Sequence, residues 1–215
     1  MSAGAAIWDR LARRYRAQEH LELHAIDAAL RLAAPERHER LVDLATGTGL
    51  VLRRLAATPR PPREAVGVDR SAGMLSRVGT LPAGWRTLQS DARAVALGAG
   101  WADVVTCAYL LHLLDADERA AVLAEARRLL GPDPAGRLAV VTLHAQRRAV
   151  AAAVRAAARL RPATWHGLRP LDPTTDVLDA GFDITHRAVL PRRGYPSLVI
   201  VAAPRVGPTM PSTGT

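Results

Sequence analysis

One twelve-residue stretch, LVDLATGTGLVL at residues 41–52, constrains the fold of this chain more than any other. It opens with an apolar run typical of a buried strand, is interrupted by Gly47 and Gly49, and continues as an apolar and basic segment with helical character. Glycine lets the backbone turn sharply and lets a ligand approach the main chain, while free N–H groups at a helix start carry partial positive charge. The stretch therefore predicts a strand, a glycine turn and a helix that bind a nucleotide-like ligand.

Two acidic residues narrow the choice of ligand. Asp43 lies within the end of the first strand, where it would repel a pyrophosphate but attract an ammonium or a sulfonium group. Twenty residues after Gly49, a second apolar run ends in Asp69, which is placed to accept hydrogen bonds from a ribose diol. Leu52 stands where dinucleotide-binding loops carry their third glycine. The pattern therefore disfavours a dinucleotide.

Four motifs follow one another along the chain: VDLATGTG (42–49), GVDRSAGML (67–75), QSDA (89–92) and ADVVTCAYLLHLL (102–114). In this order they resemble the motifs of class I S-adenosylmethionine (SAM) methyltransferases. Among these, the short small-molecule enzymes that include the ubiquinone and menaquinone C-methyltransferases are the nearest group. The resemblance covers roughly residues 40–145, and one departure is Ala45, where many members carry glycine.

The expected fold is α/β, a Rossmann-like seven-stranded mostly parallel sheet with helices on both faces and an antiparallel last strand. Strands are expected at residues 41–44, 65–69, 85–89, 102–108, 137–144, 182–190 and 198–203. Residues 1–204 are expected to form a single domain, in which residues 1–34 are a helical cap and residues 145–170 an inserted acceptor cap. The Pro-, Ser-, Thr- and Gly-rich residues 205–215 are expected to be a flexible tail.

The resemblance implies that SAM is the cofactor and S-adenosylhomocysteine the product. Asp69 would bind the ribose and Asp91 the adenine amino group, and Met74 would pack on adenine. As alternatives, Met74 is a core residue and Asp91 a loop acid without a role. The residues expected at the cofactor are Tyr15, Asp43, Ala45, Thr46, Gly47, Gly49, Asp69, Arg70, Met74, Asp91, Ala92 and Cys107.

A general base is needed only where the methyl acceptor must lose a proton. His144, at the end of the fifth strand, is the preferred candidate, although a strand-end histidine with one backbone hydrogen bond is the simpler interpretation. His112 and Tyr109, which follow the fourth strand, are the other candidates. His112 stands in a Leu-Leu-His-Leu setting common in the family, which favours a role in shaping the cofactor loop.

Segments outside the motifs are expected to meet the acceptor. Residues 7–32 have helical periodicity, and residues 145–170 look like an insertion after the fifth strand, with a solvated basic helix and surface loop as the alternative. The residues expected at the acceptor are His20, His24, Trp165, His166, Arg192 and Tyr195. His20 and His24 share a helix face, but no third ligand in a matching motif accompanies them, so no metal site is predicted.

Charge and composition limit the partners. The net charge is +9 and all 29 basic residues are arginine, which resembles the codon bias of a GC-rich bacterial genome. Because the arginines are scattered and no recognition motif occurs, a nucleic-acid partner is not expected. The segment after the fourth strand also lacks the Asn-Pro-Pro-Tyr type of motif of amino-methylating nucleic-acid enzymes. A small-molecule acceptor, anionic or carried on an acidic partner, fits the basic cap.

The sequence also indicates a cellular location and leaves two alternative functions. No apolar run approaches the roughly 18 residues of a membrane span, and the single cysteine, Cys107, cannot form an internal disulfide, so a cytoplasmic protein is expected. The first alternative function is a non-methylating protein that keeps the SAM fold, either as a binding partner or with the cofactor as structure. A nicotinamide oxidoreductase is the second. The oligomeric state, the acceptor and the atom methylated are left open.

Overall fold

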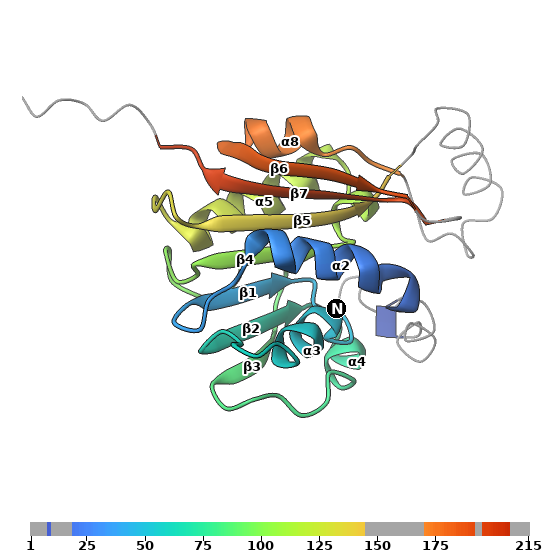
Figure 1. Cartoon of the computed structure of the whole chain (residues 1–215), viewed down its shortest axis with the longest axis vertical. Coiled ribbons are helices and arrows are strands. Elements are labelled where there is room, and N and C mark those ends of the chain that lie inside the picture. Colours follow the sequence, from blue (N-terminus) through green and yellow to red (C-terminus); the bar gives the residue numbers. More distant parts are fainter. Residues whose placement is uncertain (1–7, 10–18, 145–169, 192–194, 207–215) are drawn as a thin grey trace, which may run out of the picture.

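The computed structural model describes residues 8–9, 19–144, 170–191 and 195–206 (Figure 1). These residues form one seven-stranded sheet in the order β3-β2-β1-β4-β5-β7-β6. The strands are β1 (Arg40–Leu44), β2 (Glu64–Asp69), β3 (Trp85–Gln89), β4 (Val104–Ala108), β5 (Arg137–Leu143), β6 (Phe182–Leu190) and β7 (Ser197–Pro204). All pairings from β3 to β5 are parallel, while β7 runs antiparallel to both β5 and β6. The predicted fold class is confirmed.

Helices cover both faces of the sheet (Figure 1). On one face lie α2 (Glu19–Ala33) and α3 (Leu50–Ala56), and on the other α5 (Ala116–Leu130) and α8 (Thr174–Asp179). Two short elements, α4 (Ala72–Leu75) and the 3-10 helix η1 (Leu111–Leu113), follow the carboxyl ends of β2 and β4. The expected helix over residues 7–32 is seen as α2 and as helical Trp8 and Asp9, with residues 10–18 outside the described part. No helix in the described ranges has the length and hydropathy needed to cross a membrane.

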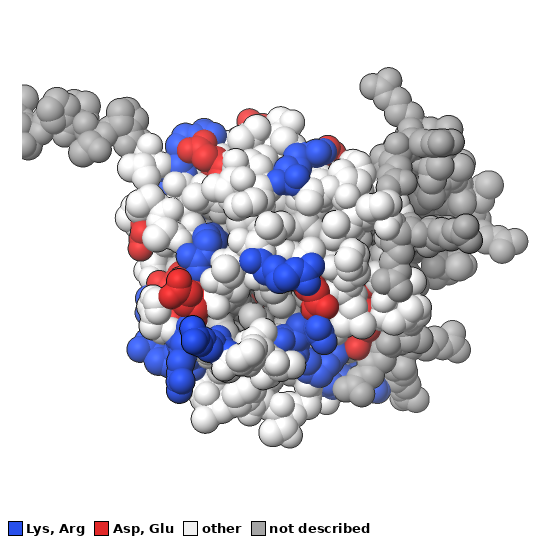
Figure 2. Space-filling model, viewed as in Figure 1, with Lys and Arg blue, Asp and Glu red and all other residues white. Residues whose placement is uncertain are grey.

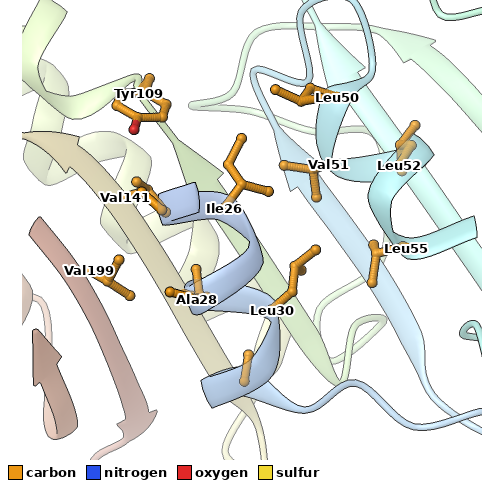
Figure 3. Packing of buried hydrophobic residues seen from close by; sticks show 14 of the residues in the cluster. Ile26, Ala28, Leu30, Leu50, Val51, Leu52, Leu55, Tyr109, Val141 and Val199 are labelled. Carbon is orange, nitrogen blue, oxygen red and sulfur yellow. The ribbon is translucent and has the colours of Figure 1, made fainter. Parts of the chain in front are cut away.

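Successive side chains along each strand point to opposite faces of the sheet, so a separate hydrophobic core lies on each face. Leu41 of β1 belongs to the core beneath α2 and α3, and its neighbour Val42 to the core beneath α5, and both are fully buried. Figure 3 shows the first of these cores, where Ile26 and Leu30 of α2 face Val51 of α3. Apolar burial on both faces of the central strands is what a parallel sheet covered by helices requires.

The helix after the glycine loop packs closely on β2. A Cβ atom added to Gly67 of β2 would lie 2.7 Å from Leu52 Cδ1 and 2.9 Å from Thr46 Oγ1. Leu52 itself is fully buried. The absence of a side chain at Gly67 therefore makes room for Leu52, the residue that replaces the third glycine of a dinucleotide-binding loop.

Acidic residues stand at the starts of two helices, α5 and α8. The capping box of α5 is present, because the Asp115 carboxylate accepts from the Glu118 N–H and the Glu118 side chain accepts from the Asp115 N–H. The acid before α8, Asp172, lies one residue further from its helix. The helix begins at Thr174, so Pro173 is the N-cap residue, while the Asp172 carboxylate accepts from the Thr174 N–H at 3.1 Å.

Surface arginines are mostly balanced by nearby acids. Figure 2 shows blue and red side chains interspersed over one face of the molecule. Two of the ion pairs are Arg54 with Asp27 at 2.7 Å and Arg137 with Glu39 at 2.6 Å. Described arginines of this kind serve local pairing, so they do not form a continuous anion-binding surface.

Candidate cofactor site

The glycine loop lies where the strand order reverses. β1 sits between β2 and β4, and the chain leaves β1 toward β2 and returns later to β4. Ligands of open α/β sheets bind at the carboxyl edge at such a point. Gly47 and Gly49 have φ of 55° and 80°, the left-handed region that glycine adopts without a steric penalty. The loop is therefore shaped for close approach of a ligand to its backbone.

Ala45 adopts a conformation that glycine adopts more easily. Its φ is 58°, in the left-handed region, where an L-residue with a Cβ atom is strained by about 1–2 kcal/mol. This strain explains why glycine suits the position in the family that the motif resembles. We expect Ala45→Gly to raise the free energy of unfolding by about 0.5–1 kcal/mol, after the larger backbone entropy of glycine in the unfolded chain is subtracted. Chemical denaturation of both proteins measures this, and a less stable variant would contradict it.

Asp69 is the last residue of β2, and its side chain also holds the glycine loop in place. One carboxylate oxygen, Oδ2, accepts from the Gly47 N–H at 2.9 Å, and the other, Oδ1, accepts from the Ser71 N–H at 2.8 Å. Burial raises the pKa of Asp69, and these backbone donors oppose the increase. Each oxygen keeps a further lone pair, so the carboxylate can accept from a ribose diol while it holds the loop.

Asp43 is a buried acid with one unsatisfied oxygen. It is 1% exposed, and Oδ1 accepts from the Thr106 hydroxyl at 2.6 Å. Within the described residues, Asp43 Oδ2 has no hydrogen-bond partner at normal geometry, although the nearby Thr46 hydroxyl interacts with the carboxyl group and lowers its pKa. Burial raises the pKa of Asp43 from 3.8 to about 6. Unsatisfied buried polar atoms are rare in folded proteins, and here Asp43 Oδ2 matches the cationic group that the sequence predicted at this position.

The expected adenine side of the site contains a contact that the sequence did not reveal. The Arg93 guanidinium pairs with Asp91 through Nε–Oδ1 at 2.9 Å and Nη2–Oδ2 at 2.7 Å. This hydrogen bonding lowers the pKa of Asp91. Arg70, which follows Asp69, and Ala92, which follows Asp91, are both half-buried. An adenine amino group would therefore share the Asp91 carboxylate with Arg93 or use nearby backbone, and this contact stays a prediction.

Met74 is buried on α4 but belongs to neither of the two cores. Its N–H donates to the Ser71 hydroxyl oxygen at 3.0 Å, so Ser71 is the N-cap of α4. Cys107, in contrast, is fully buried in the core beneath α5, and burial raises the pKa of its thiol. Cys107 can therefore reach a ligand only through its backbone, whereas Met74 remains available to pack on adenine.

Two acids from the N-terminal region, Glu19 and Asp9, contact the rim of the site, and no sequence motif predicts either contact. The Glu19 carboxylate accepts from the Thr48 hydroxyl at 2.5 Å and from Arg53 Nη2 at 2.8 Å. The Asp9 carboxylate accepts from the Ser71 hydroxyl and from the Gly73 N–H at 2.9 Å. Both the glycine loop and α4 are thus tied to residues that precede β1. Tyr15, expected at the cofactor, lies outside the described residues.

The candidate catalytic residues Tyr109 and His112 lie side by side after β4. Tyr109 is 6% exposed with φ of 55°, and its hydroxyl is 2.8 Å from Ser197 Oγ. The His112 ring meets the Tyr109 ring edge-on, with centroids 6.1 Å apart. Burial lowers the pKa of His112 to about 4, so the imidazole is neutral at pH 7. A neutral imidazole can accept a proton, and both catalytic roles stay predictions.

The other predicted residues are divided between the same edge of the sheet and the surface. His144 is half-buried directly after β5, its N–H donates to the Pro196 carbonyl at 2.8 Å, and its Nδ1 is buried without a partner among described residues. Tyr195 is buried beside Tyr109. His20 and His24 are exposed on α2. Trp165, His166 and Arg192 lie outside the described residues.

No group of three or more histidine, cysteine or acidic side chains in the described ranges is arranged to hold a metal ion.

The fold, the loop at the switch point and the acids that end β1 and β2 agree with the class I, SAM-dependent methyltransferases that the sequence motifs resemble. Residues 41–133 match the family model described as a methyltransferase domain, and this range holds Asp43, Asp69 and Asp91. The chain thus contains a methyltransferase domain, and SAM is its expected cofactor. A comparison with curated proteins found no match.

Solved structures share the fold over most of the chain. A candidate methyltransferase from Haloferax volcanii, solved with the Trm112 methyltransferase activator, is 19% identical with a TM-score of 0.74 over 92% of this chain and 97% of its own. A candidate methyltransferase from Bacillus halodurans is 17% identical with a TM-score of 0.67, over 84% and 99%. The [4+2]-cyclase SpnF is 15% identical with a TM-score of 0.68, over 86% and 81%. At these identities the likeness demonstrates the fold alone.

Proposed function

We propose that this methyltransferase transfers the methyl group of SAM to a small-molecule acceptor, such as a secondary metabolite. The observation that carries the cofactor part is the buried Asp43 carboxyl group, whose Oδ2 has no hydrogen-bond partner at normal geometry, beside a loop that Asp69 holds through the Gly47 N–H. This arrangement fits SAM, because Asp43 at the end of β1 would pair with the ammonium group of SAM and Asp69 at the end of β2 would bind its ribose. The small-molecule acceptor is supported by the segment after β4, which reads Ala108-Tyr109-Leu110 and lacks the motif of nucleic-acid amino-methylating enzymes.

The protein contributes mainly position and electrostatics to such a reaction. When bound, SAM supplies an electrophilic methyl group on a sulfonium. Asp43 and Asp69 would hold its two ends, and Met74 would fill the space beside the adenine. Holding two reactants close and aligned supplies up to roughly 7–11 kcal/mol of the barrier in favourable cases. His144 would take a proton only from an acceptor that must lose one.

The test is a calorimetric titration with S-adenosylhomocysteine, with NAD as the comparison ligand. We expect micromolar binding of S-adenosylhomocysteine and no binding of NAD, because Asp43 repels a pyrophosphate and Leu52 replaces the third glycine. Binding of NAD alone would overturn the proposal, and so would binding of neither ligand.

The alternative is a protein that keeps the SAM fold without methylating. One neighbour of the same fold supports this alternative, since SpnF is a [4+2]-cyclase. The two functions differ in product, because methyl transfer converts SAM to S-adenosylhomocysteine. Formation of S-adenosylhomocysteine in proportion to a methylated acceptor favours transfer, whereas tight SAM binding without turnover on any acceptor screened favours the alternative.

A further inference from the structure

Two buried hydroxyl groups at the candidate site each donate to an acid that precedes β1. Thr48, in the glycine loop, is 1% exposed, and Ser71, the N-cap of α4, is fully buried. The Thr48 hydroxyl donates to Glu19 Oε1 at 2.5 Å, and the Ser71 hydroxyl donates to Asp9 Oδ1. Both acids precede residues 41–133, the range that matches the methyltransferase family model. Residues ahead of that range are thus attached to the segments that follow β1 and β2.

The close approach of Asp9 to α4 depends on the glycine at position 73. Asp9 Oδ1 accepts from the Gly73 N–H at 2.9 Å. A Cβ atom added to Gly73 would lie 2.8 Å from Asp9 Oδ1 and 3.0 Å from Asp9 Cα. Because the Cα atom belongs to the backbone, rotation of the Asp9 side chain would not relieve this overlap. The φ of Gly73 is not in the left-handed region, so packing against Asp9, and not the turn of the chain, favours glycine here.

Ser71 links Asp9 to the groups that are expected to hold the cofactor. Its N–H donates to Asp69 Oδ1 at 2.8 Å, and its hydroxyl oxygen accepts from the Met74 N–H at 3.0 Å. Asp69 is the expected ribose acid, and Met74 is the expected adenine contact. The hydrogen of the same hydroxyl points to Asp9. Without Asp9, the segment from Asp69 to Met74 would lose one of the contacts that fix its position.

Glu19 has the corresponding role at the glycine loop. Its Oε1 atom accepts from Arg53 Nη2 at 2.8 Å as well as from the Thr48 hydroxyl, and the Arg53 guanidinium also donates to the Thr48 carbonyl. Glu19, Thr48 and Arg53 therefore contact one another pairwise where the loop enters α3. The Glu19 side chain is 14% exposed, so water screens this ion pair less than a surface pair.

We propose that Asp9 and Glu19 are positioning residues for the cofactor: by holding Ser71 and Thr48, they fix α4 and the glycine loop in the geometry that binds SAM. The inference rests on the proposed function and deepens it, because it assigns part of the cofactor affinity to residues ahead of the matched range. Coupling between two binding events is reciprocal. If the Asp9 contact strengthens cofactor binding, bound cofactor strengthens the Asp9 contact by the same factor.

The test is calorimetric titration of the full protein with S-adenosylhomocysteine. We expect Asp9→Ala, Gly73→Ala and Glu19→Ala each to bind at least about fivefold more weakly than wild type, the lower end of usual coupling between sites. The Ser71 and Gly73 donors share one oxygen of Asp9, and the amide oxygen of asparagine accepts in the same way. Asp9→Asn should therefore bind within about threefold of wild type. Asp9→Ala is the deciding variant if Glu19→Ala does not fold.

A spectroscopic signal next to Asp9 separates positioning from a general loss of stability. Protein labelled with 5-fluorotryptophan gives a fluorine NMR signal for Trp8, which Trp8→Phe assigns. Gly73→Ala should move this signal away from its wild-type position, because the added Cβ atom displaces Asp9. Saturation with S-adenosylhomocysteine should move the signal back toward the wild-type position, because the coupling acts in both directions. A purely structural role for Asp9 predicts no such return.

Matched controls alter similar residues elsewhere. Gly98→Ala adds a Cβ atom at an exposed glycine where nothing lies within 4 Å, and Asp117→Ala removes an exposed acid at the start of α5. Both should bind S-adenosylhomocysteine as wild type does.

The outcomes distinguish this inference from the proposed function. Wild-type protein that fails to bind S-adenosylhomocysteine would contradict the proposed function itself. Normal binding by wild type combined with unchanged affinity in folded Asp9→Ala and Gly73→Ala would overturn this inference alone. So would a Trp8 signal in Gly73→Ala that the ligand does not return toward its wild-type position.

Discussion

Replacing Asp69 with alanine is expected to weaken S-adenosylhomocysteine binding by roughly a hundredfold. The carboxylate has about four lone-pair positions, of which the Gly47 and Ser71 N–H groups use two. The remaining two suit the ribose hydroxyls, and hydrogen bonds to a charged group contribute about 1.5 kcal/mol or more each. Their sum of about 3 kcal/mol gives the expected loss, before any effect of a loosened loop is added.

Calorimetric titration of wild type and Asp69→Ala at equal pH measures the loss. Thermal unfolding of the ligand-free proteins should run alongside, because the substitution also removes the brace on Gly47. Asp179→Ala is the matched control, since Asp179 is exposed at the end of α8, on the opposite face of the sheet from α3. Unchanged affinity in a folded Asp69→Ala protein would show that the ribose is held elsewhere.

The seven strands could be predicted because the pattern that indicates each strand lies within a few consecutive residues. Residues 65–69 and 137–144 are apolar runs bounded by turns, and the observed strands start or end within two residues of those expected. The antiparallel β7 follows from the short connection to β6, since two adjacent strands joined by a short turn form a hairpin. Local pattern was sufficient for these elements.

The side-chain contacts that complete the site could not be predicted in this way. Glu19 meets Thr48, and Glu22 meets Tyr195, across 29 and 173 positions of the chain. Neither contact leaves a periodic pattern or a motif, since a glutamate on a helix is ordinary wherever it points. The positive φ of Ala45 could not be predicted either, because an alanine in a sequence does not indicate a strained backbone.

Leu52 and Gly67 illustrate how two sequence features combine into one structural feature. Taken alone, Leu52 only argues against a dinucleotide-binding loop. In the structure a Cβ atom at Gly67 would lie 2.7 Å from the Leu52 side chain, so the large residue on the helix requires the small one on β2. A dinucleotide-binding fold places its glycine on the helix to bring helix and strand together. Here the glycine is on the strand, and the same close packing results.

Replacing Asp43 with asparagine is expected to have opposite effects on stability and on cofactor binding. The folded state raises the pKa of this carboxyl from 3.8 to about 6, so it binds the proton more tightly than the unfolded state does. The contribution of Asp43 to the free energy of unfolding therefore falls as the pH rises from about 4 to about 6, and stays low above pH 6. The difference corresponds to about 3 kcal/mol. Asp43→Asn removes this unfavourable charge and should stabilise the ligand-free protein at pH 7.5 by up to that amount.

The same charge favours the ligand. Ionised Asp43 attracts the ammonium group of S-adenosylhomocysteine, so affinity should fall as the pH drops below about 6, by roughly tenfold at pH 5 where about a tenth of the carboxyl stays ionised. Asp43→Asn should bind weakly at pH 7.5 and show little further change down to pH 5. Since burial also raises the pKa of Asp69, the difference between wild type and the variant isolates the part due to Asp43.

Two measurements on one pair of proteins therefore test the site: chemical denaturation without ligand and calorimetric titration with S-adenosylhomocysteine, each at pH 5 and pH 7.5. A structural role for Asp43 would make the variant less stable at both pH values, because the Thr106 hydroxyl would lose its carboxyl acceptor. A cofactor role makes the variant more stable and weaker in binding at pH 7.5. In this explanation the buried acid destabilises the ligand-free protein, and the bound ligand supplies its missing partner. Only this explanation predicts that the variant gains stability and loses affinity at pH 7.5.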